Sequence, residues 1–412
     1  FAPVTDLGLV CVWDDGDDLL SDPHAPYPHA RDVAAIRVTQ RGAGLLLGSY
    51  ARTTEVQAWV GRGWVHPIAL PPGRARTEAP AVRVAADDDL ALERDPVRRA
   101  ARLPHEAFRV VRTGLSQGPV LVQVPRAGYV VSLSCRTCRE PVRCPYCRGR
   151  VRTDVSAGAA DPITTCTWCG RTVLSWSCPQ CGGTTWRSTR VGAQRTAEEL
   201  GRAFPGVTVR QSSADKVLTE VDATPCLVVA TPGAEPVADG GYAAALLLDA
   251  TVLLNRPDLR AGEEALRRWL LATALVRPGS EGGTVLAVGP PSSRVLQALT
   301  RVDPVGFAER ELTERIEAGL PPAVRLAVAH GEWSALTELG QSLAALPGVV
   351  VLGPALAGSA EDDEDRLARL VVKAPLASGP ALAASLRTYM AGRSARKDAR
   401  PVRIKVDPVD VG

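Results

Sequence analysis

Residues 135–181 read CRTCREPVRCPYCRGRVRTDVSAGAADPITTCTWCGRTVLSWSCPQC and hold eight of the ten cysteines in the chain. These cysteines form four Cys-x-x-Cys doublets, separated by 5, 18 and 8 residues. Both thiolates of such a doublet can turn to one metal, and two doublets supply the four sulfurs of a tetrahedral zinc site. The stretch therefore predicts a small module that holds two structural zinc ions.

The order of the doublets favours a nested arrangement. In it, the first zinc takes Cys135, Cys138, Cys178 and Cys181, and the second takes Cys144, Cys147, Cys166 and Cys169. Spacing alone also allows crossed pairing. Disulfides or a redox pair are competing interpretations, but four doublets in series are typical of repeated closed zinc sites. Closed four-thiolate sites keep no position for water, so we expect these ions to stabilise a fold and not to catalyse.

Positive charge is concentrated in this zinc segment. Over the whole chain, 48 Lys and Arg against 45 Asp and Glu give a net charge of +3, too small to indicate a polyanion partner. Within the segment the candidate DNA-binding residues are Arg136, Arg139, Arg143, Arg148, Arg150, Trp168 and Trp176. Arginines and exposed aromatic rings bind phosphates and stack bases in single-strand binders. Tryptophans also pack modules that lack a core, so the sequence leaves both roles open.

Length and composition are those of an ordinary globular protein. The chain has 412 residues, 45% hydrophobic and 23% charged, enough for two or three domains. No run of 18 apolar residues occurs, so we expect no membrane span. Clustered cysteine doublets in a large protein favour metal in a reducing cytoplasm. Because the chain begins at Phe1 inside an apolar stretch, we expect an N-terminal portion to precede it.

The regions on both sides of the zinc segment have an α/β pattern. Apolar runs typical of buried parallel strands occur at 7–13, 44–47, 119–124, 226–230, 243–248 and 284–288. Amphipathic segments predict helices at 51–61, 194–203, 262–275 and 293–300. This alternation predicts a doubly wound sheet. Pro- and Gly-rich stretches at 71–74 and 302–306 are candidate boundaries, and a helix after about Phe307 leads into further strands and helices.

Five features occur in the order and at distances compatible with one known family. They are the cysteine segment, Tyr27-Pro28-His29-Ala30-Arg31-Asp32, Pro257-Asp258-Leu259-Arg260-Ala261-Gly262-Glu263, Leu320-Pro321-Pro322 and Val406-Asp407-Pro408. Through them the chain resembles the primosomal protein N′ (PriA) family of replication restart helicases over essentially its whole length. The resemblance is to the C-terminal part of that family, starting late in its first helicase lobe.

This resemblance implies a domain order. It implies two RecA-like helicase lobes, the first one partial, a double-zinc module inserted in the second lobe, and a small α+β C-terminal domain that also contacts DNA. The ranges are 1–80 for lobe 1, 81–128 and 191–306 for lobe 2, 129–190 for the zinc module and 307–412 for the C-terminal domain. The nested pairing is the family's arrangement as well.

The same resemblance implies partners. They are forked or single-stranded DNA, single-strand binding protein and other primosome proteins, with no membrane. The protein is then expected to be a monomer of the cytoplasm, associated with the nucleoid.

The chain departs from the family where the family carries its ATPase chemistry. The pattern G-x-x-x-x-G-K-[ST] occurs nowhere, which the N-terminal portion expected to precede Phe1 also explains. Where the family has Asp-Glu-Glu-His, this chain has Trp13-Asp14-Asp15-Gly16, and Gly-Ser-Ala-Thr becomes Gly48-Ser49-Tyr50-Ala51. An indole cannot hold the Mg²⁺ shell of a carboxylate, and Asp14 and Asp15 compensate only if the strand register slips by one.

A second departure concerns the arginine fingers. By our register the two arginines of Gln-x-x-Gly-Arg-x-Gly-Arg fall on Leu275 and Pro278, which leaves Arg277 as a lone candidate. Losing one finger typically lowers the rate by about 10³ to 10⁵. The combined loss of carboxylate and finger predicts no useful turnover of ATP with Mg²⁺ as its cofactor.

These observations lead to one interpretation and two alternatives. We interpret the chain as a replication restart protein that binds forked or single-stranded DNA, helps to reload the replication machinery, and keeps its helicase core as a scaffold. One alternative is an active ATP-dependent 3′–5′ DNA helicase. The other is a scaffold whose zinc module docks partner proteins; salt separates it from the first, because phosphate binding weakens steeply as salt rises.

Overall fold

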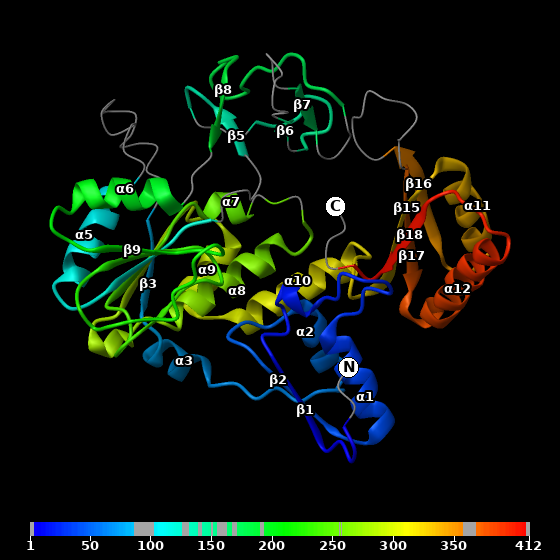
Figure 1. Cartoon of the computed structure of the whole chain (residues 1–412), viewed down its shortest axis with the longest axis horizontal. Helices are drawn as coiled ribbons and strands as arrows, with labels where there is room; N and C mark the ends of the chain where they lie inside the picture. The colour runs from blue at the N-terminus through cyan, green and yellow to red at the C-terminus, as the bar shows by residue number, and fades with distance from the viewer. Residues whose placement is uncertain are drawn as a thin grey trace. The chain divides into compact units, whose positions relative to one another are not determined.

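The chain forms two compact units (Figure 1). The computed structural model describes residues 4–85, 103–125, 132–138, 142–149, 151–154, 163–166, 171–189, 193–254, 256, 258–356 and 368–408. One unit consists of 67–162 and 174–307, and the other of 1–66, 163–173 and 308–412.

A six-stranded parallel sheet organises the first of these units. Its order is β3 (Ala81–Ala85), β14 (Thr284–Val288), β13 (Ala244–Leu247), β4 (Val120–Gln123), β11 (Leu227–Ala230) and β9 (Val209–Ser212). Every neighbouring pair is parallel. The apolar runs at 119–124, 226–230, 243–248 and 284–288 are thus confirmed as strands of one parallel sheet. Two short strands, β10 (Glu220–Val221) and β12 (Val237–Ala238), pair separately.

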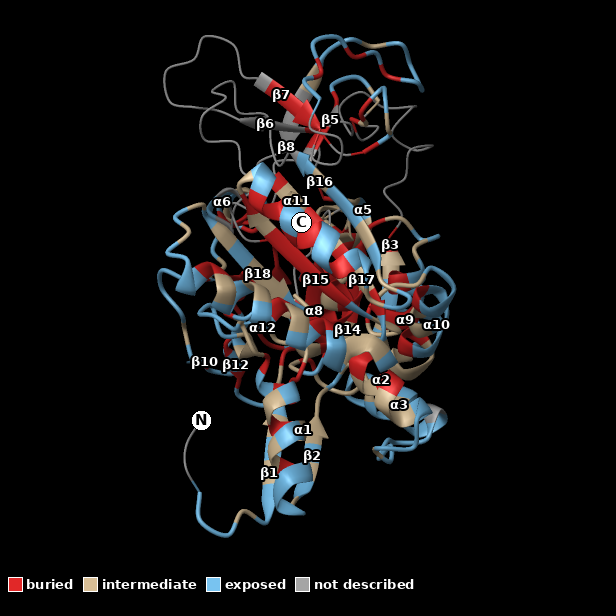
Figure 2. Cartoon of the chain, turned by 90° about the vertical axis from the view of Figure 1, so that its right-hand side faces the viewer, coloured by how far each residue is buried: buried red, intermediate tan, exposed pale blue. Residues whose placement is uncertain are grey.

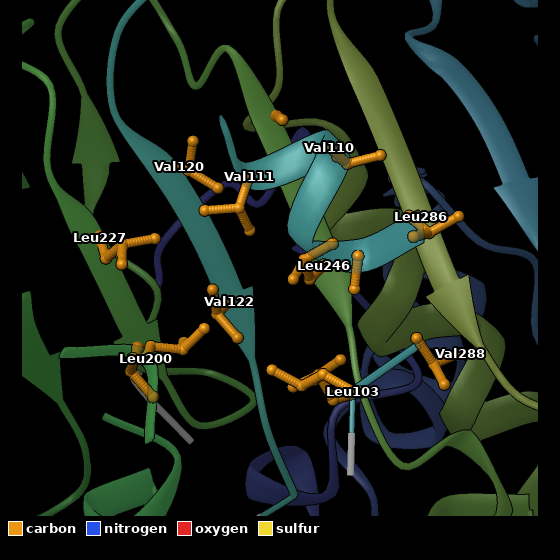
Figure 3. Packing of buried hydrophobic residues seen from close by; sticks show 14 of the residues in the cluster. Leu103, Val110, Val111, Val120, Val122, Leu200, Leu227, Leu246, Leu286 and Val288 are labelled. Atoms are coloured by element: carbon orange, nitrogen blue, oxygen red, sulfur yellow. The ribbon is translucent and has the colours of Figure 1, made fainter. Parts of the chain in front are cut away.

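Helices cover both faces of this sheet. On one face α5 (His105–Leu115) and α6 (Ala193–Ala203) enclose the main hydrophobic cluster, in which Val111, Val122 and Leu246 are fully buried (Figure 3). On the other face α8 (Ala261–Thr273) packs on β13, and α9 (Arg294–Arg301) packs on β3. This unit also contains α7 (Ala250–Leu254) and the 3-10 helix Gly279–Glu281. A sheet covered on both faces explains why its strands read as continuous apolar runs.

Local capping moves the helix ends by a few residues from their predicted places. α2 (Thr54–Gly61) begins three residues late because the Thr53 side chain accepts the N–H of Val56 at 3.2 Å. At the candidate boundary 71–74, proline starts α3 (Pro72–Glu78), and Arg74 pairs with Glu78 at 2.8 Å. At the candidate boundary 302–306, α10 (Pro304–Glu317) begins.

The N-terminal part of the second unit is a small α/β layer. β1 (Leu9–Trp13) pairs in parallel with β2 (Gly44–Gly48), which confirms the two strands expected there. A 3-10 helix (Asp18–Leu20) and α1 (Ala30–Arg41) connect them. α1 packs on both strands.

The C-terminal part of this unit is an antiparallel sheet with helices on one face. The strands lie in the order β16 (Val350–Leu356), β17 (Ala368–Pro375), β15 (Val324–Gly331) and β18 (Val402–Val406). α11 (Trp333–Ala344) and α12 (Gly379–Ala395), preceded by the 3-10 helix Leu376–Ser378, form the core with the sheet's apolar face. In Figure 2 β15 is largely red and β16 largely pale blue. The α+β domain expected after about Phe307 is present.

The zinc segment leaves the parallel sheet after β4 and returns before α6. It contains two two-stranded sheets, β5 (Ser132–Cys135) with β8 (Trp186–Thr189), and β6 (Val151–Asp154) with β7 (Ile163–Cys166). The domain ranges given above stay predictions. In the described parts of the chain, no helix combines the length and apolar character needed to cross a bilayer.

Candidate metal centre and nucleic-acid surface

The outer cysteine group brings four sulfurs together. The Sγ atoms of Cys135, Cys138, Cys178 and Cys181 all lie within 4.8 Å of one another. Cys135 and Cys181 are 3.6 Å apart, and Cys138 and Cys178 are 3.4 Å apart. A disulfide needs about 2.05 Å, whereas two thiolates on one tetrahedral zinc lie about 3.8 Å apart for Zn–S bonds of about 2.3 Å. The spacing fits a shared metal and not a covalent bond.

Backbone groups around these sulfurs favour the thiolate form. Burial acts to raise the pKa of the Cys135 thiol, but the backbone N–H groups of Cys138 and Thr137 act against it, and its pKa falls to about 6. Cys178 starts a tight turn in which its N–H donates to Gly183 at 2.8 Å and its carbonyl accepts from Gly182 at 2.9 Å. Gly182 takes the left-handed conformation that this turn requires. Metal ligation needs deprotonated sulfur, so the local structure suits it.

The inner cysteine group has the same turn chemistry. The Sγ atoms of Cys144, Cys147 and Cys166 lie within 4.8 Å of one another, and Cys169 lies outside the described residues. The N–H of Cys144 donates to Gly149 at 2.7 Å, and the N–H of Gly149 approaches the Cys147 sulfur at 3.4 Å. The group is the second one that could hold a metal ion, and it contains three of the four ligands expected for it.

The structure separates the candidate DNA-binding residues of this segment. Arg136 and Arg148 are exposed, Arg143 is half-buried, and Arg139, Arg150 and Trp168 lie outside the described residues. Trp176 is only 6% exposed and meets Trp186 edge-on, with ring centroids 6.0 Å apart. This geometry favours the packing role for Trp176 over base stacking.

Two large apolar side chains of the segment point to solvent and were not singled out in the sequence. Leu174 is 92% and Tyr146 63% exposed. Tyr146 lies between the cysteines of its doublet, and Leu174 lies in the spacer before the last doublet. Solvent-exposed side chains at metal turns are available to a partner, and no sequence pattern distinguishes them from buried ones.

The end of β1 holds the first of the degenerate motifs. Trp13 is 63% exposed and meets Tyr50 edge-on at 5.8 Å. The Asp14 backbone N–H donates to Gly48 at 2.6 Å, and its carboxylate accepts from Ser49 Oγ at 2.9 Å. The two motifs are therefore neighbours in space, and an exposed indole stands where the resemblance predicts a metal-binding carboxylate.

Asp15 is held inside the fold. Its Oδ2 atom accepts from Arg31 Nη1 at 3.2 Å and from Thr53 Oγ1 at 2.7 Å. Both charged side chains are 4% exposed, and Glu55 lies 3.7 Å from the same Arg31 nitrogen. Burial raises the pKa of Asp15, although the charge of Arg31 opposes the shift. Arg31 belongs to the Tyr27–Asp32 motif of the sequence, whose structural work is therefore to neutralise the acidic end of β1.

Arg277 lies at the amino end of the parallel sheet. Its Nε donates to the carbonyls of Gly240 and Gly241 at 2.9 and 3.1 Å, and its Nη1 to that of Gln117 at 3.3 Å. These carbonyls precede β13 and β4. Ligands of parallel sheets bind at the opposite, carboxyl ends of the strands. In this position Arg277 ties three backbone carbonyls together, which does not suit an arginine finger.

A basic surface that the sequence analysis missed lies on the C-terminal sheet. His330 of β15 stands opposite Arg369 of β17 on one side and Arg403 of β18 on the other. Lys405 shares this face, because it lies two residues from Arg403 on the same strand. Burial, and then the charges of Arg369, Lys405 and Arg403, lower the pKa of His330. We call these four residues the basic face. The alternation in Val402–Val406 was the only signal for it in the sequence.

Comparisons with known proteins cover the whole chain. A family model described as the primosomal protein N C-terminal domain matches residues 316–409. Over its full length the chain is 47% identical to the probable replication restart protein PriA of Mycobacterium leprae, of which it covers 64%. It is 46% identical to the protein of the same name from Mycobacterium tuberculosis, of which it covers 65%. Over 81% of its length it is 24% identical to replication restart protein PriA of Bacillus subtilis, covering 42% of that protein. The chain thus spans less than two thirds of these relatives.

Proposed function

Because this chain belongs to the family of replication restart proteins PriA, we propose that it binds forked or single-stranded DNA and helps to reload the replication machinery. The observation that carries the proposal is identity of 46–47% to mycobacterial relatives over the whole chain. On this proposal the six-stranded sheet is the second RecA-like lobe, the β1–β2 layer is the end of the first, and single-strand binding protein and primosome proteins are partners.

We propose that the metal of both cysteine groups is Zn²⁺. Sulfur ligands in fours suit zinc, which has no redox chemistry and accepts tetrahedral geometry readily. The outer ion would be held by Cys135, Cys138, Cys178 and Cys181, and the inner one by Cys144, Cys147, Cys166 and Cys169, which keeps the nested pairing. Zinc would supply cross-links to a segment whose described strands form two-stranded sheets of four-residue strands.

DNA contact is assigned to two surfaces. The exposed side chains of Arg136 and Arg148 support contact through the zinc segment. The basic face supports contact through the C-terminal domain, because the Arg403 side chain is exposed and Lys405 adds a second positive charge on the same face.

On this proposal the chain has no useful ATP turnover. It is supported by the exposed Trp13 at the position of the first carboxylate, by the enclosure of Asp15 between Arg31 and Thr53, and by the carbonyl contacts of Arg277. Mg²⁺ needs oxygen ligands that can reorganise around nucleotide phosphates. A carboxylate enclosed in a buried ion pair lacks that freedom.

The alternative of a protein-docking module is favoured by one observation, the exposure of Leu174 and Tyr146. An exposed tyrosine matches the aromatic anchors of protein interfaces, and Leu174 adds exposed apolar surface. Under this alternative, substitution of Leu174 would abolish partner capture and leave DNA affinity unchanged.

The experiment that tests the proposed function is binding of the full-length protein to a labelled forked DNA between 50 and 200 mM salt, with zinc content measured on the same sample. We expect about two zinc per chain, and affinity that falls by about 10³-fold or more if six or more phosphates are contacted. Leu174→Ala serves as the variant that leaves charge unchanged. Weak binding that is insensitive to salt would contradict the proposal and favour the docking module.

A further inference from the structure

Arg403 of the basic face is held by an aromatic residue from the other end of the chain. Its Nε donates to the hydroxyl of Tyr27 at 2.7 Å, and its guanidinium carbon lies 4.7 Å from the centre of the Tyr27 ring. The Lys405 amine lies 5.4 Å from the same ring. Residues 376 positions apart thus meet within one compact unit. Contacts with two cations fix the orientation of the tyrosine ring and the position of its hydroxyl.

Tyr27 is itself fixed by its loop. Its backbone has φ of +58°, a conformation that a bulky side chain adopts only when its surroundings impose it. Its N–H donates to the carbonyl of His24 at 2.7 Å, and the Asp22 N–H donates to Pro28 at 2.9 Å across the loop. The loop ends at His29, which is buried and caps α1. The platform under Arg403 is therefore rigid.

The contact with Tyr27 uses only part of what Arg403 offers. A guanidinium carries five N–H donors, and the hydroxyl takes the one on Nε. Among the described residues, Tyr27 is the one hydrogen-bonding and ring partner of Arg403, whose side chain is exposed. The two terminal amino groups remain available for an anion. A planar fork with two amino groups matches the oxygens of a phosphate, and stacking on a ring does not interfere with it.

We propose that Tyr27 is a positioning residue for DNA: it holds the Arg403 fork in the orientation that receives a backbone phosphate, while Lys405 adds a second positive charge. The inference rests on the proposed function and deepens it, because it makes the phosphate site a joint product of the N-terminal layer and the C-terminal sheet. Preorganisation acts by removing the ordering cost of a long side chain at the moment of binding.

The test is a double-mutant cycle on single-stranded DNA binding by the whole chain, across a salt series. Arg403→Ala is expected to weaken binding about tenfold and to reduce the slope of log K against log salt by about 0.7, the value of one lost phosphate contact. Tyr27→Leu is expected to weaken binding about threefold with little change of slope, because the charge stays. In the Arg403→Ala background, Tyr27→Leu should have no further effect.

Two further variants make the test specific. Tyr27→Phe keeps the ring and removes the acceptor, so it should lie between the wild type and Tyr27→Leu. Arg387→Ala, an exposed arginine on α12, is the matched control and should leave affinity unchanged. Thermal unfolding of each variant establishes that it is folded.

The outcomes separate this inference from the proposed function. An equal effect of Tyr27→Leu with and without Arg403, or none at all, overturns the positioning role. Absence of salt-dependent binding by the wild type would overturn the proposed function itself, whatever the variants do.

Discussion

The acidic end of β1 and the basic face of the C-terminal sheet use their charges in opposite ways. At β1, Asp15 and Arg31 are both 4% exposed and satisfy each other inside the fold. On the basic face, Arg403 is exposed and meets a tyrosine in place of a carboxylate. Charge that the fold neutralises serves structure, and charge that it leaves to solvent is available to a ligand. On the proposed function, this difference separates the DNA-binding residues from the residues at the end of β1.

Removal of the proposed metal should have the largest effect. The cysteine groups resemble the Asp15–Arg31 pair, because their charges are neutralised inside the fold. Thiolates packed within 4.8 Å of one another repel unless a cation lies between them. A strong chelator, or Cys144→Ser with Cys147→Ser, should unfold the zinc module and leave the parallel sheet folded. Circular dichroism and calorimetry measure the two separately. Loss of every thermal transition would show that the module is not independent.

Arg31→Ala should cost about 3–5 kcal/mol of unfolding free energy, because it leaves Asp15 buried without its partner. Urea denaturation gives the value. The matched variant is Arg387→Ala, an exposed arginine whose removal should cost less than about 0.5 kcal/mol. DNA affinity of the folded fraction should not change with either. A loss below about 1 kcal/mol for Arg31→Ala would mean that the pair at β1 is not structural.

The double variant Arg403→Ala with Lys405→Ala tests whether the basic face serves DNA binding and not stability. Removing the exposed charge of Arg403 and the half-buried charge of Lys405 should weaken DNA binding at least tenfold and leave the thermal midpoint nearly unchanged. Parallel fluorescence anisotropy and thermal scans make the measurement. If stability falls and affinity does not, the basic face is structural and the contrast with β1 disappears.

The smallest expected effect is the pH dependence of His330. Its folded pKa is lowered, so its neutral form contributes stability that is present above its ordinary pKa of about 6.5 and lost as pH falls through the folded value. Acidification should therefore lower the melting temperature of the wild type more than that of His330→Gln. Bound DNA should reduce the difference, because phosphates offset Arg369, Lys405 and Arg403. If DNA leaves this difference in melting temperature unchanged, the phosphates do not lie over the basic face.

Features carried by neighbouring residues could be predicted from the sequence. The cysteine doublets predicted two groups that could hold a metal ion, and the apolar runs predicted parallel strands, because both depend on local spacing. A helix begins later than its predicted residue where a single side chain supplies the N-cap, as Thr53 does for α2. The basic face was missed because His330, Arg369 and Arg403 come from three strands, which only the sheet register brings together. The burial of Trp176 and the carbonyl contacts of Arg277 depend on tertiary packing in the same way.

We propose that this chain recognises DNA without useful turnover of ATP. The most direct test is DNA-stimulated ATP hydrolysis by the full-length protein on a forked substrate, measured beside fork binding in the same buffer. The account predicts tight, salt-sensitive binding with hydrolysis no faster than that of an Asp14→Ala variant. Hydrolysis that rises with forked DNA and disappears on Asp14→Ala would contradict it, and the chain would then be part of a working helicase.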